Sequence, residues 1–364
     1  MEIFFRIPWI TVGMAALVAF WVSYVSIPTV VNVAREKGLY DFPNGRTSHI
    51  RKTPTLGGIA IFSAFVISCL FFLPHSNLHE FQYVLLGVVI MFFVGLKDDI
   101  LVLAPFKKLV AQIVAAVIII DMAQLRFTSL HGFFGIYDIS YHAGLYLTLF
   151  VVVVITNAFN LVDGIDGLAS GLGSLSFLIF GMWFFMNGEI GWTVVCFSMM
   201  GALIAFFRFN VYSIDKKIFM GDTGSLIVGF VISAVVIKFN QYSLNSALPH
   251  PVFSSPAVSF GIIFIPLFDT LRVFILRMMN KKSPFSPDRR HLHHMLLDLK
   301  FKHVQASTIL IGINAFMVLV SFMFQKSGIL HLILYQFILG LAITCILYFL
   351  ARRKSSIVQS GIQS

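Results

Sequence analysis

Charged residues are scarce in this chain, and their scarcity excludes an ordinary water-soluble protein. Only 12% of the 364 residues are Asp, Glu, Lys or Arg, against about a quarter in soluble domains, and the mean hydropathy is +0.90. The three cysteines lie far apart in apolar segments, so neither a disulfide framework nor a cysteine metal site is indicated. The chain is therefore predicted to be an integral membrane protein.

Several common motifs are also missing. The sequence has no GxxxxGK[ST], no GxGxxG and no HExxH, which argues against a P-loop ATPase, a dinucleotide site and a zinc protease. It has no internal repeat and no linker, so residues 1–364 are interpreted as one domain, and nucleic acid is not expected as a partner. A β-barrel would need alternating ten-residue segments, which are not seen.

Long apolar runs are abundant instead. An all-α, polytopic membrane fold with about eleven transmembrane helices is predicted, because each run is long enough to cross roughly 30 Å of hydrocarbon. The predicted spans are 10–33, 56–73, 81–96, 109–125, 144–160, 168–186, 191–208, 224–239, 257–277, 307–324 and 331–350.

Basic residues fall unevenly between the two sides of this bundle. With these spans, 22 of the 26 lysines and arginines lie on one side, which is therefore predicted to be cytoplasmic. Aspartates gather on the same side, although anionic lipids attract only the bases. They form four clusters at or beside helix ends: Asp98 and Asp99, Asp163 and Asp166, Asp215 and Asp222, Asp269 and Asp288. This predicts one polar site on the cytoplasmic face.

The stretch NAFNLVDGIDGLASG (157–171) places polar side chains directly between two apolar runs. Gly164 and Gly167 predict that the helix ends here, so that Asp163 and Asp166 lie in a loop. Asn157 and Asn160 then point into the bundle. The alternative is a simple helix end, where Asn and Asp satisfy loose backbone groups. If the residues serve a ligand instead, Asp166→Ala should leave the stability of the ligand-free protein unchanged or raise it.

Two further segments are suited to phosphate groups. In FMGDTGSL (219–226), Asp222 or Thr223 can cap a helix that begins near Gly224, whose free N–H groups favour anions. SPFSPDRRHLHH (283–294) breaks at its prolines before a short amphipathic helix rich in arginine and histidine. With no cysteine partner it is a poor zinc site, and its arginines are better suited to phosphates or a sugar.

With KTPTLGG (52–58) and GLKDDI (95–100), these segments resemble, in order and spacing, the polyprenyl-phosphate N-acetylhexosamine-1-phosphate transferases. The resemblance implies transfer of a sugar 1-phosphate from a UDP-sugar to undecaprenyl phosphate in the bacterial cytoplasmic membrane, with release of UMP. It also implies Mg²⁺, or Mn²⁺ in its place. The form DRRHLHH is similar to the branch that uses UDP-GlcNAc, whereas the UDP-MurNAc-pentapeptide branch shows three successive histidines. The lipid product would begin a cell-surface polysaccharide such as lipopolysaccharide.

The resemblance also assigns roles to residues of this chain. It implies Asp222 and Asp99 on the metal, Asp98 on the lipid phosphate, and Asp166 with Phe219 on the uracil. The remaining implied catalytic or substrate-binding residues are Lys52, Lys108, Asn157, Asn160, Asp163, Arg289, Arg290, His291, His293 and His294.

Alternatives remain open. Asp98 is interpreted as a base, a positioning group or a covalent nucleophile, and a lipid phosphate that ionises near neutral pH needs little help from a base. Another UDP-N-acetylhexosamine or UDP-MurNAc-pentapeptide is the alternative substrate, and a homodimer is compatible with the sequence. A transporter is the alternative class, although transporter sites lie near the bilayer midplane.

Overall fold

The computed structural model describes residues 7–41, 53–281 and 290–362, with side chains up to residue 350. Its order is α2 (Pro8–Glu36), β1 (Tyr40–Asp41), β2 (Thr53–Pro54), α3 (Gly57–Phe72), η1 (His75–Asn77), α4 (Leu78–Leu101), α5 (Pro105–Asp121), β3 (Ser129–Phe133), β4 (Ile136–Asp138), α6 (Tyr141–Val162), α7 (Leu168–Met186), α8 (Ile190–Tyr212), α9 (Gly221–Tyr242), α10 (Ser255–Ile262), α11 (Phe264–Met279), α12 (Leu292–Asp298), α13 (His303–Met323), η2 (Gln325–Ser327) and α14 (Ile329–Ile362).

The predicted membrane fold is confirmed. Each of the eleven predicted spans coincides with a helix, except that 257–277 is split into α10 and α11, which meet at 87°. Within the described residues, seven helices are long and apolar enough to cross a membrane, or up to nine if each bent pair counts as one span. The number eleven therefore stays a prediction. The two small antiparallel pairs β1–β2 and β3–β4 were not predicted.

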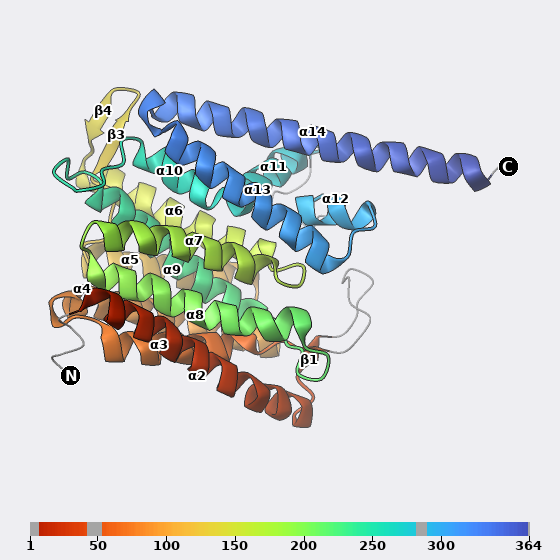
Figure 1. The fold of residues 1–364 in the computed structure, drawn as a ribbon, viewed down its shortest axis with the longest axis horizontal. Coiled ribbons are helices and arrows are strands. Elements are labelled where there is room, and N and C mark those ends of the chain that lie inside the picture. The colour runs from red at the N-terminus through yellow and green to blue at the C-terminus, as the bar shows by residue number, and fades with distance from the viewer. Residues whose placement is uncertain (1–6, 42–52, 282–289, 363–364) are drawn as a thin grey trace.

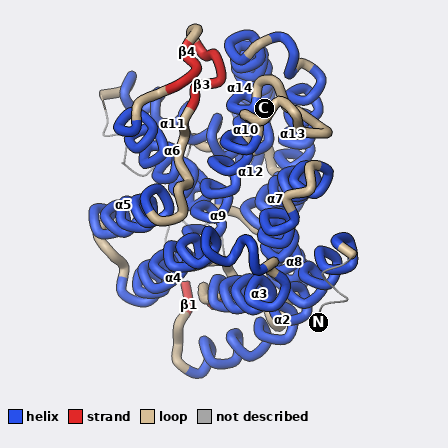
Figure 2. Tube along the Cα trace, turned by 90° about the vertical axis from the view of Figure 1, so that its left-hand side faces the viewer, coloured by secondary structure: helices blue, strands red, loops and turns tan. Residues whose placement is uncertain are grey.

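Helix α9 lies at the centre of the bundle, surrounded by the other long helices (Figure 2). In its most apolar 18-residue stretch, 89% of the residues are buried, against 17% in the corresponding stretch of α14. Helix α14 lies along the edge of the bundle and extends beyond it (Figure 1). Glycines allow neighbours to approach the start of α9 closely. A Cβ on Gly58 of α3 would lie 2.2 Å from Gly224 N, and one on Gly95 of α4 would lie 2.4 Å from Thr223 Cα.

Candidate active site

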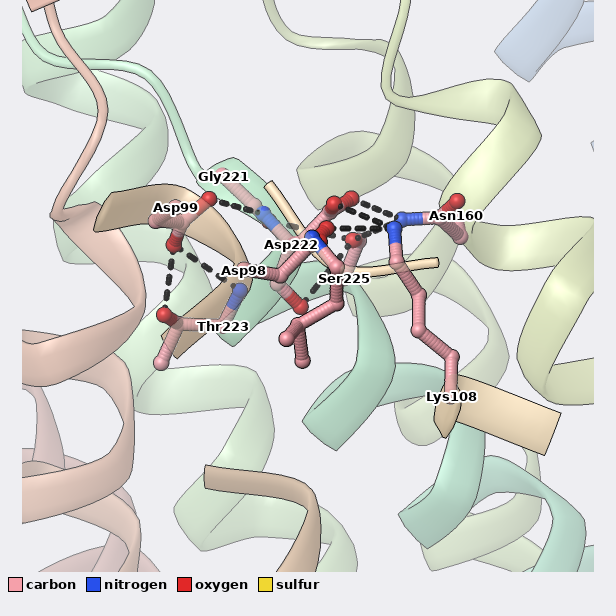
Figure 3. A network of polar contacts seen from close by, with 9 residues as sticks. Asp98, Asp99, Lys108, Asn160, Gly221, Asp222, Thr223 and Ser225 are labelled. Carbon is pink, nitrogen blue, oxygen red and sulfur yellow. Dashed lines mark hydrogen bonds and ion pairs between the residues drawn. The ribbon is translucent and has the colours of Figure 1, made fainter. Parts of the chain in front are cut away.

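The first turn of α9 is held by a carboxylate from another helix (Figure 3). Asp99, near the end of α4, accepts hydrogen bonds from Asp222 N at 2.7 Å, Thr223 N at 3.0 Å and Thr223 Oγ1 at 2.5 Å. The predicted start near Gly224 was wrong, since α9 begins at Gly221 and Asp99 supplies the capping contacts. Asp99 thus occupies two N–H groups at the start of α9, the helix end where phosphate was expected, and a carboxylate is stable there because of the helix dipole.

Three charged side chains from three helices meet beside this turn (Figure 3). Lys108 Nζ on α5 pairs with Asp222 Oδ2 at 2.8 Å and also with Asp98 Oδ2. Asn160 on α6 donates from Nδ2 to Asp222 Oδ1 and to Ser225 Oγ, the latter at 2.9 Å. The side chain of Asp98 is 5% exposed and that of Asp222 is 29% exposed, so the cluster is reached from outside at Asp222.

This cluster offers oxygen ligands for a divalent cation. Asp98 and Asp222 already converge on one positive charge, the Lys108 ammonium. Within the part of the chain that the structure describes, no group of three or more His, Cys, Asp or Glu side chains forms a complete metal site. Mg²⁺ is usually held by one or two carboxylates together with water and substrate phosphates, so the residues present fit it. The predicted role of Asp99 as a ligand stays a prediction, because its oxygens also serve α9.

The loop between α6 and α7 contains Asp163 and Asp166, as predicted. Asp166 Oδ2 pairs with Lys217 Nζ at 2.6 Å and with His303 Nδ1 at 3.3 Å. Its Oδ1 is buried and has no hydrogen-bond partner among the described residues. An unmatched carboxylate oxygen is costly to bury, so it is a candidate acceptor for a ligand N–H.

The two aspartates of this loop differ in their preferred protonation state. Burial raises the pKa of Asp163 well above its usual value, and the carboxylates of Asp222, Asp99 and Asp166 raise it further. Burial acts in the same direction on Asp166, but hydrogen bonds from His303 and Lys217 outweigh it and lower the pKa of Asp166. The ionised form is therefore disfavoured at Asp163 and favoured at Asp166.

Phe219 is positioned by backbone contacts with β2 and with the first residue of α3. Its N–H donates to Pro54 O at 2.8 Å, and its carbonyl accepts from Gly57 N at 2.9 Å. The ring is partly exposed, and Lys217 Nζ lies 5.8 Å from its centroid. Because Lys217 also pairs with Asp166, the structure brings Asp166 and Phe219 into one neighbourhood.

The histidine segment is anchored by a buried aspartate of α11. Asp269 is 3% exposed, and its Oδ2 lies 3.0 Å from His291 Nδ1. Its Oδ1 accepts from Leu292 N at 3.1 Å and from Arg272 Nη2 at 2.8 Å. These contacts fix the start of α12 on α11, and the bond to Nδ1 orients the imidazole of His291.

His293 connects α12 to the Asp163–Asp166 loop. A Cβ on Gly164 would lie 2.8 Å from His293 Nε2, so this glycine admits the ring. Burial, together with the charge of a protonated His294, lowers the pKa of His293 to about 3. The ring of His294 lies 4.2 Å from that of His293 and is partly exposed. At neutral pH His293 is therefore an uncharged packing residue.

The sequence of this chain is similar to those of known transferases. Residues 81–240 match the model of glycosyl transferase family 4. Undecaprenyl-phosphate alpha-N-acetylglucosaminyl 1-phosphate transferase of Escherichia coli (strain K12) is 32% identical over 75% of this chain and 73% of its own. The protein of that name from Salmonella typhi is 34% identical over the same shares. A probable undecaprenyl-phosphate N-acetylglucosaminyl 1-phosphate transferase of Bacillus subtilis (strain 168) is 29% identical over 88% of this chain and 87% of its own.

The chain belongs to glycosyl transferase family 4. It is therefore a multi-pass membrane transferase, and membership of this enzyme family counts against the transporter alternative. The family match includes both Asp98 and Asp222, the carboxylates that share Lys108.

Asn157, one of the residues predicted for this family 4 site, does not contact the carboxylate cluster. Asn157 donates from Nδ2 to Gln112 Oε1 on α5 and to Val153 O, each at 2.8 Å. Of the two predicted asparagines, Asn160 is the one whose side chain contacts Asp222. Arg290 lies just before α12 and His294 lies within it, while Lys52 and Arg289 lie outside the described residues.

The structure also adds residues that were not predicted. They are Gln112, Lys217, Ser225, Arg272 and His303. The spacing of Lys108 and Gln112 puts them on one face of α5, which was a usable signal. The partners of Asp166 and His291 lie on other helices, so no local pattern indicated them.

We expect Asp163→Asn to stabilise the ligand-free family 4 protein at neutral pH. A carboxyl group with a raised pKa favours folding only while protonated, so its contribution is lost as pH rises from its ordinary pKa of about 4 through the raised value. Melting temperatures of wild type and variant, measured in EDTA from pH 5 to 8, should diverge with increasing pH, with the variant higher by a few degrees. The exposed Asp215→Asn is the matched control, and a lower melting temperature for Asp163→Asn throughout would contradict this assignment.

Proposed function

We propose that the protein transfers GlcNAc-1-phosphate from UDP-GlcNAc to undecaprenyl phosphate on the cytoplasmic face of the bacterial membrane. UMP is released, and the lipid product initiates a cell-surface polysaccharide. The observation that carries the proposal is the Asp98–Lys108–Asp222 cluster at the start of α9, in a chain of glycosyl transferase family 4. The names of the relatives from three bacteria support the choice of both substrates.

The proposed chemistry is a phosphoryl substitution. An oxygen of undecaprenyl phosphate attacks the phosphorus that bears GlcNAc, a new P–O bond forms, and the bond from that phosphorus to the bridging oxygen of UMP breaks. UMP leaves with the electron pair. Such reactions depend chiefly on positioning and on neutralising charge, and Lys108 beside two carboxylates is placed for both.

Mg²⁺, or alternatively Mn²⁺, is the cofactor proposed, and when bound it neutralises charge on the diphosphate. Asp222 and Asp98 would hold it, with Asn160 orienting Asp222. Asp98 also pairs with Lys108 and accepts from Leu103 N. A carboxylate engaged in this way is a poor nucleophile, which favours direct transfer over a covalent aspartyl intermediate. The proposed role of Asp98 in the reaction is therefore to position the lipid phosphate.

The nucleotide is proposed to bind beside Phe219. The ring would stack on uracil, and the unmatched Oδ1 of Asp166 would accept the imide N–H. Arg290, His291 and His294 are proposed to contact the sugar and its phosphate. Asp269 holds His291 in place, and the buried His293 supports the segment by packing. The DRRHLHH form supports GlcNAc over MurNAc-pentapeptide.

Turnover by the purified protein tests this proposal. Given UDP-GlcNAc, undecaprenyl phosphate and Mg²⁺, the protein is expected to release UMP, and mass spectrometry should find lipid-linked GlcNAc-1-phosphate. Other UDP-N-acetylhexosamines and UDP-MurNAc-pentapeptide serve as competing substrates. Turnover of UDP-MurNAc-pentapeptide alone would overturn the sugar assignment, and no UMP from any of these donors would overturn the reaction.

A further inference from the structure

The turn between α4 and α5 is strongly apolar. Residues 100–106 read ILVLAPF and include no polar side chain. Leu101, Val102 and Phe106 are 66%, 86% and 73% exposed. One exposed apolar side chain is ordinary, but tight turns in water favour Gly, Asn, Asp and Ser, so a continuous apolar run indicates contact with something apolar.

Charge on both sides of the turn indicates what that contact is. Lys97 and Lys107 flank the apolar run, and both are exposed. They belong to the basic side of the bundle that the sequence predicts to be cytoplasmic. An apolar tip between lysines is typical of segments that lie at the boundary between headgroups and acyl chains of an anionic leaflet. We propose that the 100–106 turn inserts into the cytoplasmic leaflet and holds the Asp98–Lys108 pair at the depth of the lipid phosphates.

The turn is tied directly to the candidate active site. Leu103 N–H donates to the side chain of Asp98, and Val102 N–H donates to the carbonyl of Asp98 at 3.0 Å. Val102 has a φ of +49°, a left-handed conformation that is uncommon for a β-branched residue. At the far end of the turn, Lys108 pairs with Asp98. A shift of the turn therefore moves both groups of the pair.

This arrangement has a kinetic consequence that rests on the proposed function. The phosphate of undecaprenyl phosphate is held at headgroup level by its long chain, whereas UDP-GlcNAc arrives from water. Insertion of the turn therefore matters for the long-chain acceptor in a bilayer. It does not matter for the nucleotide sugar, or for a short prenyl phosphate presented in detergent.

Insertion of the 100–106 turn into the membrane can be measured without an activity assay. A nitroxide is attached to Val102→Cys in the Cys345→Ser background, in which Cys69 and Cys196 are buried. Ile214→Cys is the control, because Ile214 is 78% exposed but stands alone in a connection with Asp215, Lys216 and Lys217. In vesicles containing anionic lipid, the label at Val102 should be more accessible to oxygen than to a water-soluble nickel complex, and the control should show the reverse. Aqueous exposure of the Val102 label would overturn the proposal, even if the protein proved inactive.

Kinetics test the functional part. The double variant Val102→Gln and Phe106→Gln is compared with Ile214→Gln. We expect the KM for undecaprenyl phosphate in vesicles to rise about tenfold or more. The KM for UDP-GlcNAc, and turnover of a short prenyl phosphate in detergent, should not change. An unchanged KM for undecaprenyl phosphate, or an equal rise for UDP-GlcNAc, would contradict the role of the turn. Failure of the wild type to use UDP-GlcNAc would instead reject the proposed function, and the label would still decide insertion.

Discussion

Asp222→Asn is expected to abolish transfer while the protein still inserts and purifies normally. Asparagine keeps the size of the side chain but loses the negative charge that pairs with Lys108 and is proposed to hold Mg²⁺. The loss in turnover should be on the order of a thousandfold or more, because several kcal/mol of charge stabilisation disappear from the transition state. The fold should persist, since Lys108 keeps Asp98 as a partner. EDTA should have the same effect on the wild type, and Mg²⁺ should restore its activity.

Ser225→Ala is the matched control for this experiment. Ser225 lies on the same turn of α9 and accepts from Asn160 at 2.9 Å, but it carries no charge. Its loss should reduce turnover by no more than about tenfold, the effect of one neutral hydrogen bond. Wild-type activity in Asp222→Asn, or an equal loss in both variants, would remove Asp222 from the charged centre of the site.

The fold follows from the sequence as far as apolar length decides it. Apolar runs of 16 to 24 residues predict the long helices, and Gly164 with Gly167 marks the end of α6 correctly. The break at Ile263 inside 257–277 was missed because the residues on both sides of it are apolar (FGIIFIPLF, 260–268), so hydropathy gives no boundary there. The β3–β4 hairpin was missed because its strands have only five and three residues.

Most residues of the candidate site could be predicted from the sequence, but only some of the contacts between them could. Aspartates at helix ends indicated one polar face, and Asp98, Lys108, Asn160 and Asp222 do meet there. The pairing of Asp99 with the start of α9 was not predictable, because it depends on how closely α4 packs against α9. Sequence spacing shows which residues share a helix face, whereas the contacts between helices depend on packing.

Asp166→Ala is expected to weaken UMP binding about tenfold to a hundredfold. Asp166 would lose its role as the charged acceptor for the uracil imide, and a hydrogen bond to a charged group contributes roughly 1.5 to 3 kcal/mol. The sequence-based expectation also held that Asp166→Ala leaves the stability of the ligand-free protein unchanged or raises it, and the structure changes this part. Because His303 and Lys217 lower the pKa of Asp166, its ionised form stabilises the fold above the ordinary pKa, and that stability is lost as pH falls through the lowered value. The melting temperature of the ligand-free variant at pH 7 should therefore fall slightly instead of holding or rising.

Lys217→Met separates the two effects of Asp166. It removes the ion pair at 2.6 Å but leaves the carboxylate in place. Since Lys217 is 30% exposed and such pairs are weak, both variants should lose only a few degrees in melting temperature. Calorimetric titration with UMP on the same preparations should then show a large loss of affinity for Asp166→Ala and a much smaller one for Lys217→Met. Equal affinity losses, or a stability loss in Asp166→Ala with unaltered UMP affinity, would make Asp166 a partner of the fold and not of the nucleotide.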